Sequence, residues 1–230
     1  MKYCLPIFLF ILFSCKEKKP ETQLVAQPPF WNDIQNFKKQ DSVSFPPKNA
    51  ILFIGSSSFT MWKDVQEYFP GYTIINRGFG GSTLLDQIRY AGDIIFPYEP
   101  KQIVIYCGEN DLASSDTVTA QLVFERFKKL FEMIDHETKS SIAYISMKPS
   151  PSRRHLFSKM IEANKLIKDH IEFHNHTLDS RRTAAYIDVF SKMMIANGQP
   201  IPGIFLEDSL HMNAKGYAIW QKEIHPYLLK

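Results

Sequence analysis

The sequence predicts a three-layer α/β/α sandwich with a five-stranded parallel sheet, and three features of the chain support this prediction. Five apolar runs of strand length alternate with longer segments whose apolar residues have helical spacing. The runs are continuous, which is typical of strands that helices cover on both faces. Glycine and polar residues follow the runs directly, at the strand ends where parallel sheets bind ligands. The expected strands are residues 50–54, 72–76, 102–107, 141–147 and 184–189.

The segments between these strands predict the covering helices. A short amphipathic helix is expected within 30–39, and a connector with two prolines leads from it to the first strand. Two longer helices are expected within 117–136 and 152–174, and Asn213 is placed to cap a last helix. The expected inward residues are Val123, Phe127, Leu130, Phe131 and Ile134 in the first long helix, and Phe157, Met160, Ile161, Ile167 and Ile171 in the second. In the last helix they are Tyr217, Trp220, Ile224 and Leu228.

The composition is that of one globular domain. Hydrophobic residues make up 44% of the 230 residues and charged residues 22%, which excludes a disordered chain and a polytopic membrane protein. The formal net charge is only +3, so acidic and basic side chains nearly balance and do not suggest a nucleic-acid partner. Of three cysteines, only Cys107 lies outside the N-terminal segment. A single cysteine excludes an internal disulfide and a thiolate zinc site, so Cys107 is expected to be a small buried apolar residue.

The N-terminal segment has the pattern of an export signal. Lys2 precedes an apolar run at residues 3–13 that is too short to cross a bilayer as a helix. The residues Leu12-Phe13-Ser14-Cys15 resemble the lipobox of bacterial lipoproteins. This resemblance implies a signal peptide at residues 1–14, lipidation of Cys15, and a protein anchored to a membrane on its extracytoplasmic side. The alternative is an ordinary export signal with an incidental cysteine.

Three segments follow the signal in this interpretation. Residues 15–29 are polar and contain proline, and they form a tether between the membrane and the domain. Residues 30–49 hold the short helix and its connector, and residues 50–230 form the domain.

The loops after the first two strands carry serine and glycine. Gly55-Ser56-Ser57-Ser58 can present a serine hydroxyl above the sheet, although a serine there can equally be a helix cap. Phe59 stands where the G-x-S-x-G elbow of another hydrolase class needs glycine. The glycines of 76–82 allow the backbone to approach a ligand. A dinucleotide loop would need its third glycine at Thr83, and no Gly-Lys-Ser/Thr follows for a phosphate loop.

Two further groups complete the pattern. Gly108-Glu109-Asn110-Asp111 ends the third strand, where an amide side chain can donate a hydrogen bond into the same cavity. Asp208-Ser209-Leu210-His211 separates a carboxylate from an imidazole by three residues, so that the carboxylate can hold the tautomer that a general base needs. Each group alone is common, but the order of all four is specific.

In this order the four groups resemble the SGNH hydrolases, also called GDSL-like esterases and lipases, over about residues 50–229. The resemblance implies a flavodoxin-like sandwich and a serine esterase that needs no metal or organic cofactor. It also implies a catalytic triad of Ser57, Asp208 and His211, and an oxyanion hole formed by Ser57, Gly81 and Asn110. Ser56 and Ser82 replace residues that are usually aspartate in the family. The choice of Ser57 over Ser56 and Ser58 depends on alignment with the family's first block.

The substrate interpretation stays open at this point. A small acyl group such as acetyl on a carbohydrate is expected, by analogy with the family. The alternatives are a lipase, phospholipase or thioesterase near the membrane, and a non-catalytic surface-binding lipoprotein. Several residues before Asp208 could wall an apolar acyl pocket or belong to the core; they are Met193, Met194, Ile201, Ile204 and Phe205.

Two other groups have alternative interpretations. The histidines His170, His174 and His176 could bind a metal, but a solvated helix end is the simpler interpretation. The basic loop at residues 148–154 could contact an anionic substrate, or could be a solvated loop that initiates a helix.

Overall fold

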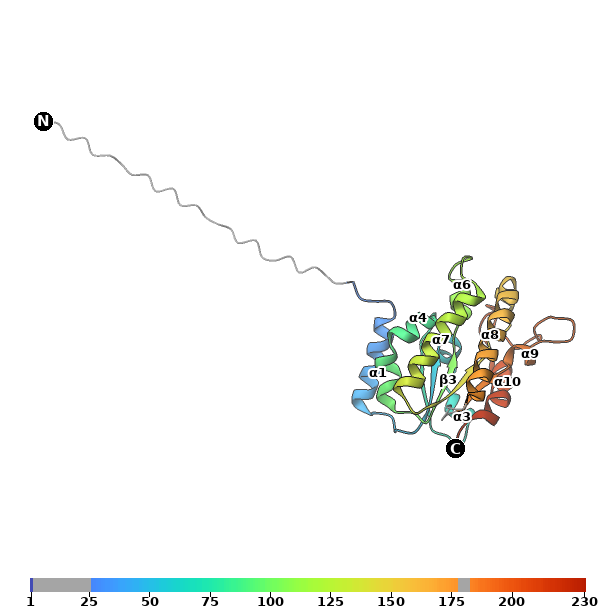
Figure 1. The fold of residues 1–230 in the computed structure, drawn as a ribbon, viewed down its shortest axis with the longest axis horizontal. Helices are drawn as coiled ribbons and strands as arrows, with labels where there is room; N and C mark the ends of the chain where they lie inside the picture. The colour runs from blue at the N-terminus through green and yellow to red at the C-terminus, as the bar shows by residue number, and fades with distance from the viewer. Residues whose placement is uncertain (2–25, 178–182) are drawn as a thin grey trace.

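The computed structural model describes Met1 together with residues 26–177 and 183–230. Its centre is a five-stranded sheet in the order β2-β1-β3-β4-β5, with every neighbouring pair parallel (Figure 1). The strands are β1 (Ile51–Gly55), β2 (Ile74–Gly78), β3 (Gln102–Tyr106), β4 (Ser141–Ile145) and β5 (Ala184–Ile187). This sheet, flanked by helices, confirms the predicted fold class.

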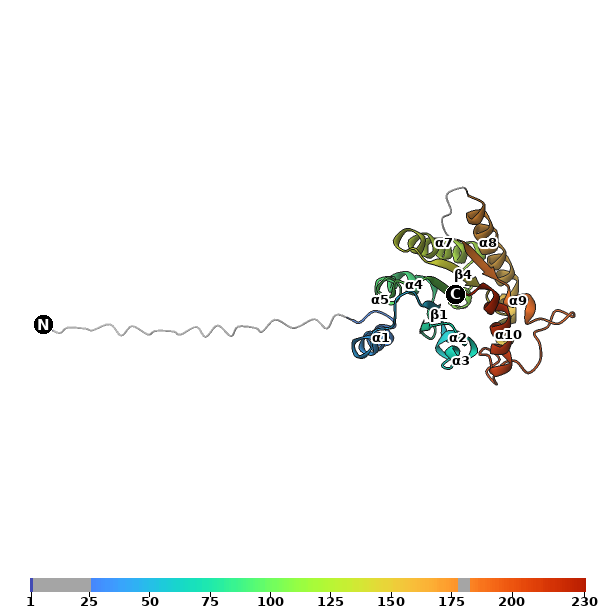
Figure 2. The same cartoon turned by 90° about the horizontal axis from the view of Figure 1, so that it is seen from below.

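Helices cover both faces of the sheet (Figure 1 and Figure 2). One layer holds α1 (Trp31–Val43), α4 (Leu84–Arg89), α5 (Ala91–Ile94), α7 (Ala120–Glu137) and α8 (Phe157–His176). The other holds α2 (Ser57–Thr60), α3 (Val65–Tyr68), α9 (Val189–Lys192) and α10 (Ala214–Ile224). In β1, Leu52 and Ile54 belong to the first core, whereas Ile51 and Phe53 belong to the second. Burial on both faces explains why the strands are continuous apolar runs.

Several local predictions are confirmed. The five inward residues expected in α7 are all buried. Oδ1 of Asn213 accepts the backbone N–H groups of Lys215 and Gly216 at 2.9 and 3.3 Å, so Asn213 caps α10. Cys107 is 1% exposed and belongs to the core.

The N-terminal predictions lie mostly outside the described residues. The signal peptide, Cys15 and the tether up to residue 25 fall there. In the ranges that the structure describes, no helix combines the length and the apolar character needed to span a membrane.

The prediction for the second strand is wrong by two residues, since β2 extends to Gly78. Asn76 and Arg77 lie inside it although they are polar, because distant groups satisfy them. The Asn76 side chain donates to the carbonyl of Phe59 at 2.7 Å, and Arg77 pairs with Asp41 of α1. The same ion pair explains why α1 continues past residue 39.

The prediction for α8 is wrong at two points. Ile161 is 54% exposed, because the buried stripe of the helix runs through Met160, Ala163, Ile167 and Ile171. The helix begins at Phe157, after a 3-10 turn at Pro151–Leu156. The backbone N–H of Ser152 donates to the carbonyl of Ser209 at 3.0 Å, so this turn is bonded to a distant loop and does not continue the helix.

A buried charge clamp attaches α1 to the sheet. Arg77 of β2 is 7% exposed and forms an ion pair with Asp41 of α1. The hydroxyl of Tyr98 accepts from Arg77 Nε at 2.7 Å and donates to Asp41 Oδ2 at 2.5 Å. Burial and the hydrogen bond to Asp41 raise the pKa of Tyr98 to about 12. The guanidinium also lies 5.2 Å from the ring centroid of Phe37, so the charge is enclosed by the helix that it holds.

Replacing Asp41 with alanine should lower the free energy of unfolding by about 3 kcal/mol, because Arg77 would keep a buried charge without its partner. Urea denaturation measures this loss. The matched control is Lys48→Ala, which removes an ion pair with Glu99 whose two side chains are each 62% exposed. This control should cost less than about 0.5 kcal/mol. Equal losses in the two variants would contradict the clamp.

Candidate active site

Three polar side chains from distant parts of the chain meet at the carboxyl end of β1. Ser57 is the first residue of α2, directly after the strand. Its Oγ lies 2.9 Å from Nε2 of His211, and Nδ1 of the same ring lies 2.6 Å from Oδ2 of Asp208. When Nδ1–H donates to the carboxylate, Nε2 carries the lone pair that can accept the serine proton. The structure therefore joins the three expected triad residues in one chain of hydrogen bonds.

A tight turn positions the imidazole. Oδ1 of Asp208 accepts the backbone N–H groups of Leu210 and His211, each at 2.9 Å. Ser209, which follows Asp208, has a left-handed backbone with φ 55°. The N–H of Leu206 closes the turn by donating to the carbonyl of His211 at 2.7 Å. The hydrogen bond from the His211 side chain, together with those from the backbone, lowers the pKa of Asp208 to about 2. The carboxylate is therefore ionised at neutral pH.

The three consecutive serines have different surroundings. Ser56 is 4% exposed and Ser58 is 1% exposed, whereas Ser57 is half-buried and contacts His211. The Ser58 hydroxyl has no hydrogen-bond partner among the described residues. Tyr217 of α10 donates to the Ser58 carbonyl at 2.8 Å, which holds the start of α2 against α10 within the same helical layer. Packing thus distinguishes Ser57 from its two neighbours.

The glycine loop after β2 passes beside Ser57. A Cβ built on Gly80 would lie 3.9 Å from Cβ of Ser57, and Gly81 has a left-handed φ of +82° that favours glycine. Ser82 donates to the carbonyl of Gly55 at 3.1 Å and so ties the loop to β1. The backbone N–H groups of Ser57 and Gly81 have no acceptor within the residues that the structure describes. Both donors are free to bind a ligand.

Asn110 adds a side-chain donor. It lies in α6 (Glu109–Ala113), directly after β3. Its Nδ2 donates to the carbonyl of Ser82 at 3.0 Å, and its Oδ1 accepts from Nη2 of Arg153 at 2.9 Å. The amide is therefore held at both ends, and one of its two N–H bonds is left for a ligand.

The neighbouring Asp111 has structural contacts. This fully buried carboxylate accepts the backbone N–H of Leu84 at 2.9 Å and pairs with Arg126 at 2.7 Å. It joins the first turn of α4, which follows the glycine loop, to α6 and α7. Asp111 thereby fixes the position of the glycine loop relative to the helix that carries Asn110.

The basic loop after β4 is solvated only in part: Pro151, Ser152 and Arg154 are exposed, whereas Lys148 is buried. Lys148 is 2% exposed, and its Nζ lies 2.8 Å from Oε2 of the buried Glu109. Neither interpretation of the loop from the sequence anticipates this ion pair. The sequence contains a signal for it: Glu109 and Lys148 each lie three residues past the end of neighbouring buried strands, β3 and β4, and a buried carboxylate requires a cation. Sequence reasoning also missed Arg153 as the partner of Asn110.

The remaining candidates have structural contacts of their own. His170 packs its ring against Phe131 at 5.2 Å, and His174 packs against the same ring at 4.9 Å. No group of three potential metal ligands occurs in the described part of the chain. Met193 and Ile204 are 0% and 4% exposed and belong to the core, whereas Met194, Ile201 and Phe205 are half-buried.

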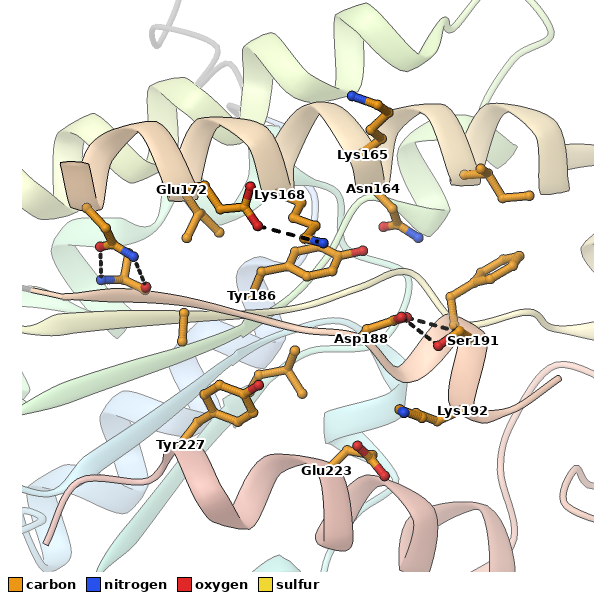
Figure 3. Close-up of a pocket in the computed structure, with 17 residues that line it drawn as sticks. Asn164, Lys165, Lys168, Glu172, Tyr186, Asp188, Ser191, Lys192, Glu223 and Tyr227 are labelled. Carbon is orange, nitrogen blue, oxygen red and sulfur yellow. Dashed lines mark hydrogen bonds and ion pairs between the residues drawn. The ribbon is translucent and has the colours of Figure 1, made fainter. Parts of the chain in front are cut away.

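A cavity of about 760 Å³ lies at the outer edge of the sheet, between α8, β5 and α10 (Figure 3). Tyr186, Asp188, Lys192 and Glu223 are among its lining residues, and Ser57, His211 and Asp208 are not. The candidate catalytic residues therefore lie outside this cavity, at the strand ends.

A serine, a histidine and an ionised carboxylate in contact, beside free backbone donors, are the arrangement of serine hydrolases. Residues 54–219 match the GDSL-like Lipase/Acylhydrolase family, and the chain belongs to this family of carboxylic ester hydrolases. No curated protein matches the chain. The matched segment contains all of the expected catalytic residues.

Solved structures share the fold at low sequence identity. A candidate acylhydrolase from Bacteroides fragilis superposes with a TM-score of 0.71 at 19% identity, covering 86% of this chain and 96% of the other. A GDSL-like lipase from Bacteroides thetaiotaomicron gives 0.68 at 17% identity, with 84% and 96% covered. A catalytic mutant of an acetylxylan esterase from Geobacillus stearothermophilus gives 0.58 at 15% identity, with 78% and 93% covered.

Proposed function

We propose that the protein hydrolyses carboxylic esters through a covalent acyl-enzyme formed on Ser57. The observation that carries this proposal is the 2.9 Å contact between Ser57 Oγ and His211 Nε2, with Asp208 2.6 Å from the other ring nitrogen. His211 is the general base, and Asp208 holds its tautomer and stabilises the imidazolium that forms.

In the first step His211 takes the Ser57 proton while Oγ bonds to the ester carbonyl carbon. The carbonyl oxygen becomes an oxyanion that accepts from the N–H groups of Ser57 and Gly81 and from the Asn110 amide. Each such donor typically contributes a factor of roughly 10² to 10³ in rate. The intermediate expels the alcohol, which takes the proton from His211, and water then releases the acid by the same route. No step of this route requires a metal or an organic cofactor.

Ser57→Ala should lower kcat by roughly 10⁴-fold or more, and His211→Ala should do the same. The double variant should be scarcely slower than either single variant, because the two residues act as a unit. Asp208→Ala should cost less, since this residue supports the base and transfers no proton. Hydrolysis of nitrophenyl acetate measures these rates, and thermal melting checks the fold.

Ser56→Ala is the matched control, because it removes a neighbouring hydroxyl that does not contact His211. It should retain most of the activity. Turnover like that of the wild type in Ser57→Ala would overturn the assignment. An inactive Ser56→Ala with an active Ser57→Ala would move the nucleophile by one residue.

For the substrate we propose a small acyl group, such as acetyl, on a carbohydrate. Two observations support this proposal. An acetylxylan esterase is among the proteins that share the fold. Two of the five residues that could have walled an apolar acyl pocket, Met193 and Ile204, are part of the core.

The value of kcat/KM should be higher for nitrophenyl acetate than for nitrophenyl esters of ten carbons or more, and acetylated xylooligosaccharides should release acetate. Activity that rises with acyl length would favour the lipase alternative instead. Absence of hydrolysis of every oxygen ester and thioester tested would favour a non-catalytic surface-binding protein.

We also propose that the protein is an exported lipoprotein, with residues 1–14 as signal peptide and Cys15 as the acylated residue. The lipobox-like residues 12–15 support this proposal. Pro29 and Phe30 pack on the domain near the glycine loop: Tyr90 donates to the carbonyl of Pro29 at 2.5 Å, and Phe30 packs on Phe79. From Cys15 to Pro29 an extended chain spans at most about 50 Å, so the active site would work within that distance of the membrane.

Cys15→Ala should abolish acylation and move the protein from the membrane fraction to the soluble fraction of cells that express it. Two or more acyl chains give stable anchoring, whereas one is marginal. Mass spectrometry of the mature N-terminus reads the modification directly. An unmodified N-terminus in the wild type would contradict the lipoprotein proposal.

A further inference from the structure

A buried cluster of charges lies directly behind Asn110. Glu109 is 3% exposed, and its Oε2 accepts from the hydroxyl of Tyr106 and from Lys148. Its Oε1 accepts from the hydroxyl of Ser150 at 2.7 Å. Burial alone would raise the pKa of Glu109, but the charges of Lys148 and Arg153 outweigh it and lower that pKa. Glu109 is therefore a fixed negative charge next to Asn110 in the chain.

Arg153 connects this charge to the Asn110 amide. Its side chain is 18% exposed, and its Nη1 lies 3.7 Å from Oε1 of Glu109. Nη1 has no hydrogen-bond partner among the described residues, whereas Nη2 donates to Oδ1 of Asn110 at 2.9 Å. The guanidinium thus lies within ion-pair distance of the Glu109 carboxylate, and its Nη2 is hydrogen-bonded to the amide.

We propose that Arg153 is a positioning residue for the Asn110 amide in the oxyanion hole, an inference that rests on the proposed function. An asparagine amide can rotate by 180° and exchange its oxygen and nitrogen. A guanidinium can only donate and the Ser82 carbonyl can only accept. These two contacts together allow one orientation, with Nδ2 toward Ser82 and the oxyanion. The reverse orientation would present a carbonyl oxygen to the oxyanion and repel it.

The charge of Arg153 also strengthens the donor. A hydrogen bond from a cation to the amide oxygen withdraws electron density from the amide, so that its N–H bonds donate more strongly. The effect is large in a partly buried site, where solvent screening is weak. Because this donor acts on the charge that develops in the transition state, its loss should lower kcat more than it changes KM.

The same loop also touches the segment that carries the base. The backbone N–H of Ser152 donates to the carbonyl of Ser209 at 3.0 Å, and the Ser150 hydroxyl lies 3.4 Å from the carbonyl of Leu210. Ser209 and Leu210 separate Asp208 from His211. The loop after β4 therefore braces the oxyanion side and the base side of the site against each other.

Arg153→Ala should lower kcat for nitrophenyl acetate by roughly 10- to 100-fold, less than or equal to the loss of an oxyanion donor, with KM changed by less than about 3-fold. Arg154→Ala is the matched control, because the adjacent arginine is exposed and bonds Gln199. It should retain kcat within about 2-fold. Arg153→Lys keeps a charge beside Glu109 but has a single nitrogen, which cannot contact Glu109 and Asn110 as the two guanidinium nitrogens do. It should also lower kcat, by less than Arg153→Ala does. It also serves as the test if Arg153→Ala does not fold.

A double-mutant cycle with Asn110→Ala separates positioning from mere stability. If Arg153 acts through Asn110, Arg153→Ala should cost little further kcat in the Asn110→Ala background. Effects that multiply independently, a change confined to KM, or full kcat in both Arg153 variants would overturn the inference. A parent protein without esterase activity would instead refute the proposed function, so the two failures are distinguishable.

Discussion

The pairing of β1 with a strand on each side is the constraint on which the active site depends. Gly55 at the end of β1 lies level with Gly78 of β2 and Tyr106 of β3, so three strands end together and their loops meet. Space at this level is minimal: a Cβ on Gly55 would lie 1.9 Å from the Tyr106 carbonyl oxygen, and one on Gly78 would lie 2.5 Å from Cβ of Phe59. Glycine at position 78 lets α2 pack close to the sheet, and glycine at position 55 lets the end of β1 lie against β3. Both contacts help to place Ser57 beside the glycine loop.

Around that edge the protein uses buried charge for geometry. Asn110 lies between two buried carboxylates, Glu109 and Asp111, and each is paired with basic residues from other elements. A buried ion pair adds little net stability, because the cost of desolvating both charges offsets their attraction. The hydrogen bonds of such a pair are directional, however. Here the paired residues and their neighbours contact the segment after the glycine loop, the Asn110 amide and the turn that carries His211. The buried charges thus keep the proposed oxyanion donors and the proposed general base in fixed positions relative to each other.

Much of this architecture could be predicted from the sequence, because it depends on patterns of neighbouring residues in the chain. Two-sided burial makes strands such as β1 and β3 continuous apolar runs, and Asn213 is a recognisable cap at the start of α10. The errors arise where a distant partner changes a residue's environment. Arg77 lies inside β2 because α1 supplies Asp41, and Lys148 is buried because Glu109 follows the neighbouring strand.

The pattern of residues along the chain was sufficient to predict the fold class, the order of the four groups at the strand ends and the residue types that serine chemistry needs. Folding selects which of the three serines meets the imidazole, since Ser57 and His211 are 154 residues apart and their contact depends on how α2 and the last loop pack. It also sets which way the Asn110 amide points, because the Ser82 carbonyl and Arg153 come from different loops. Residue identity is local in the chain, but the direction of a side chain is set by neighbours that only folding brings together.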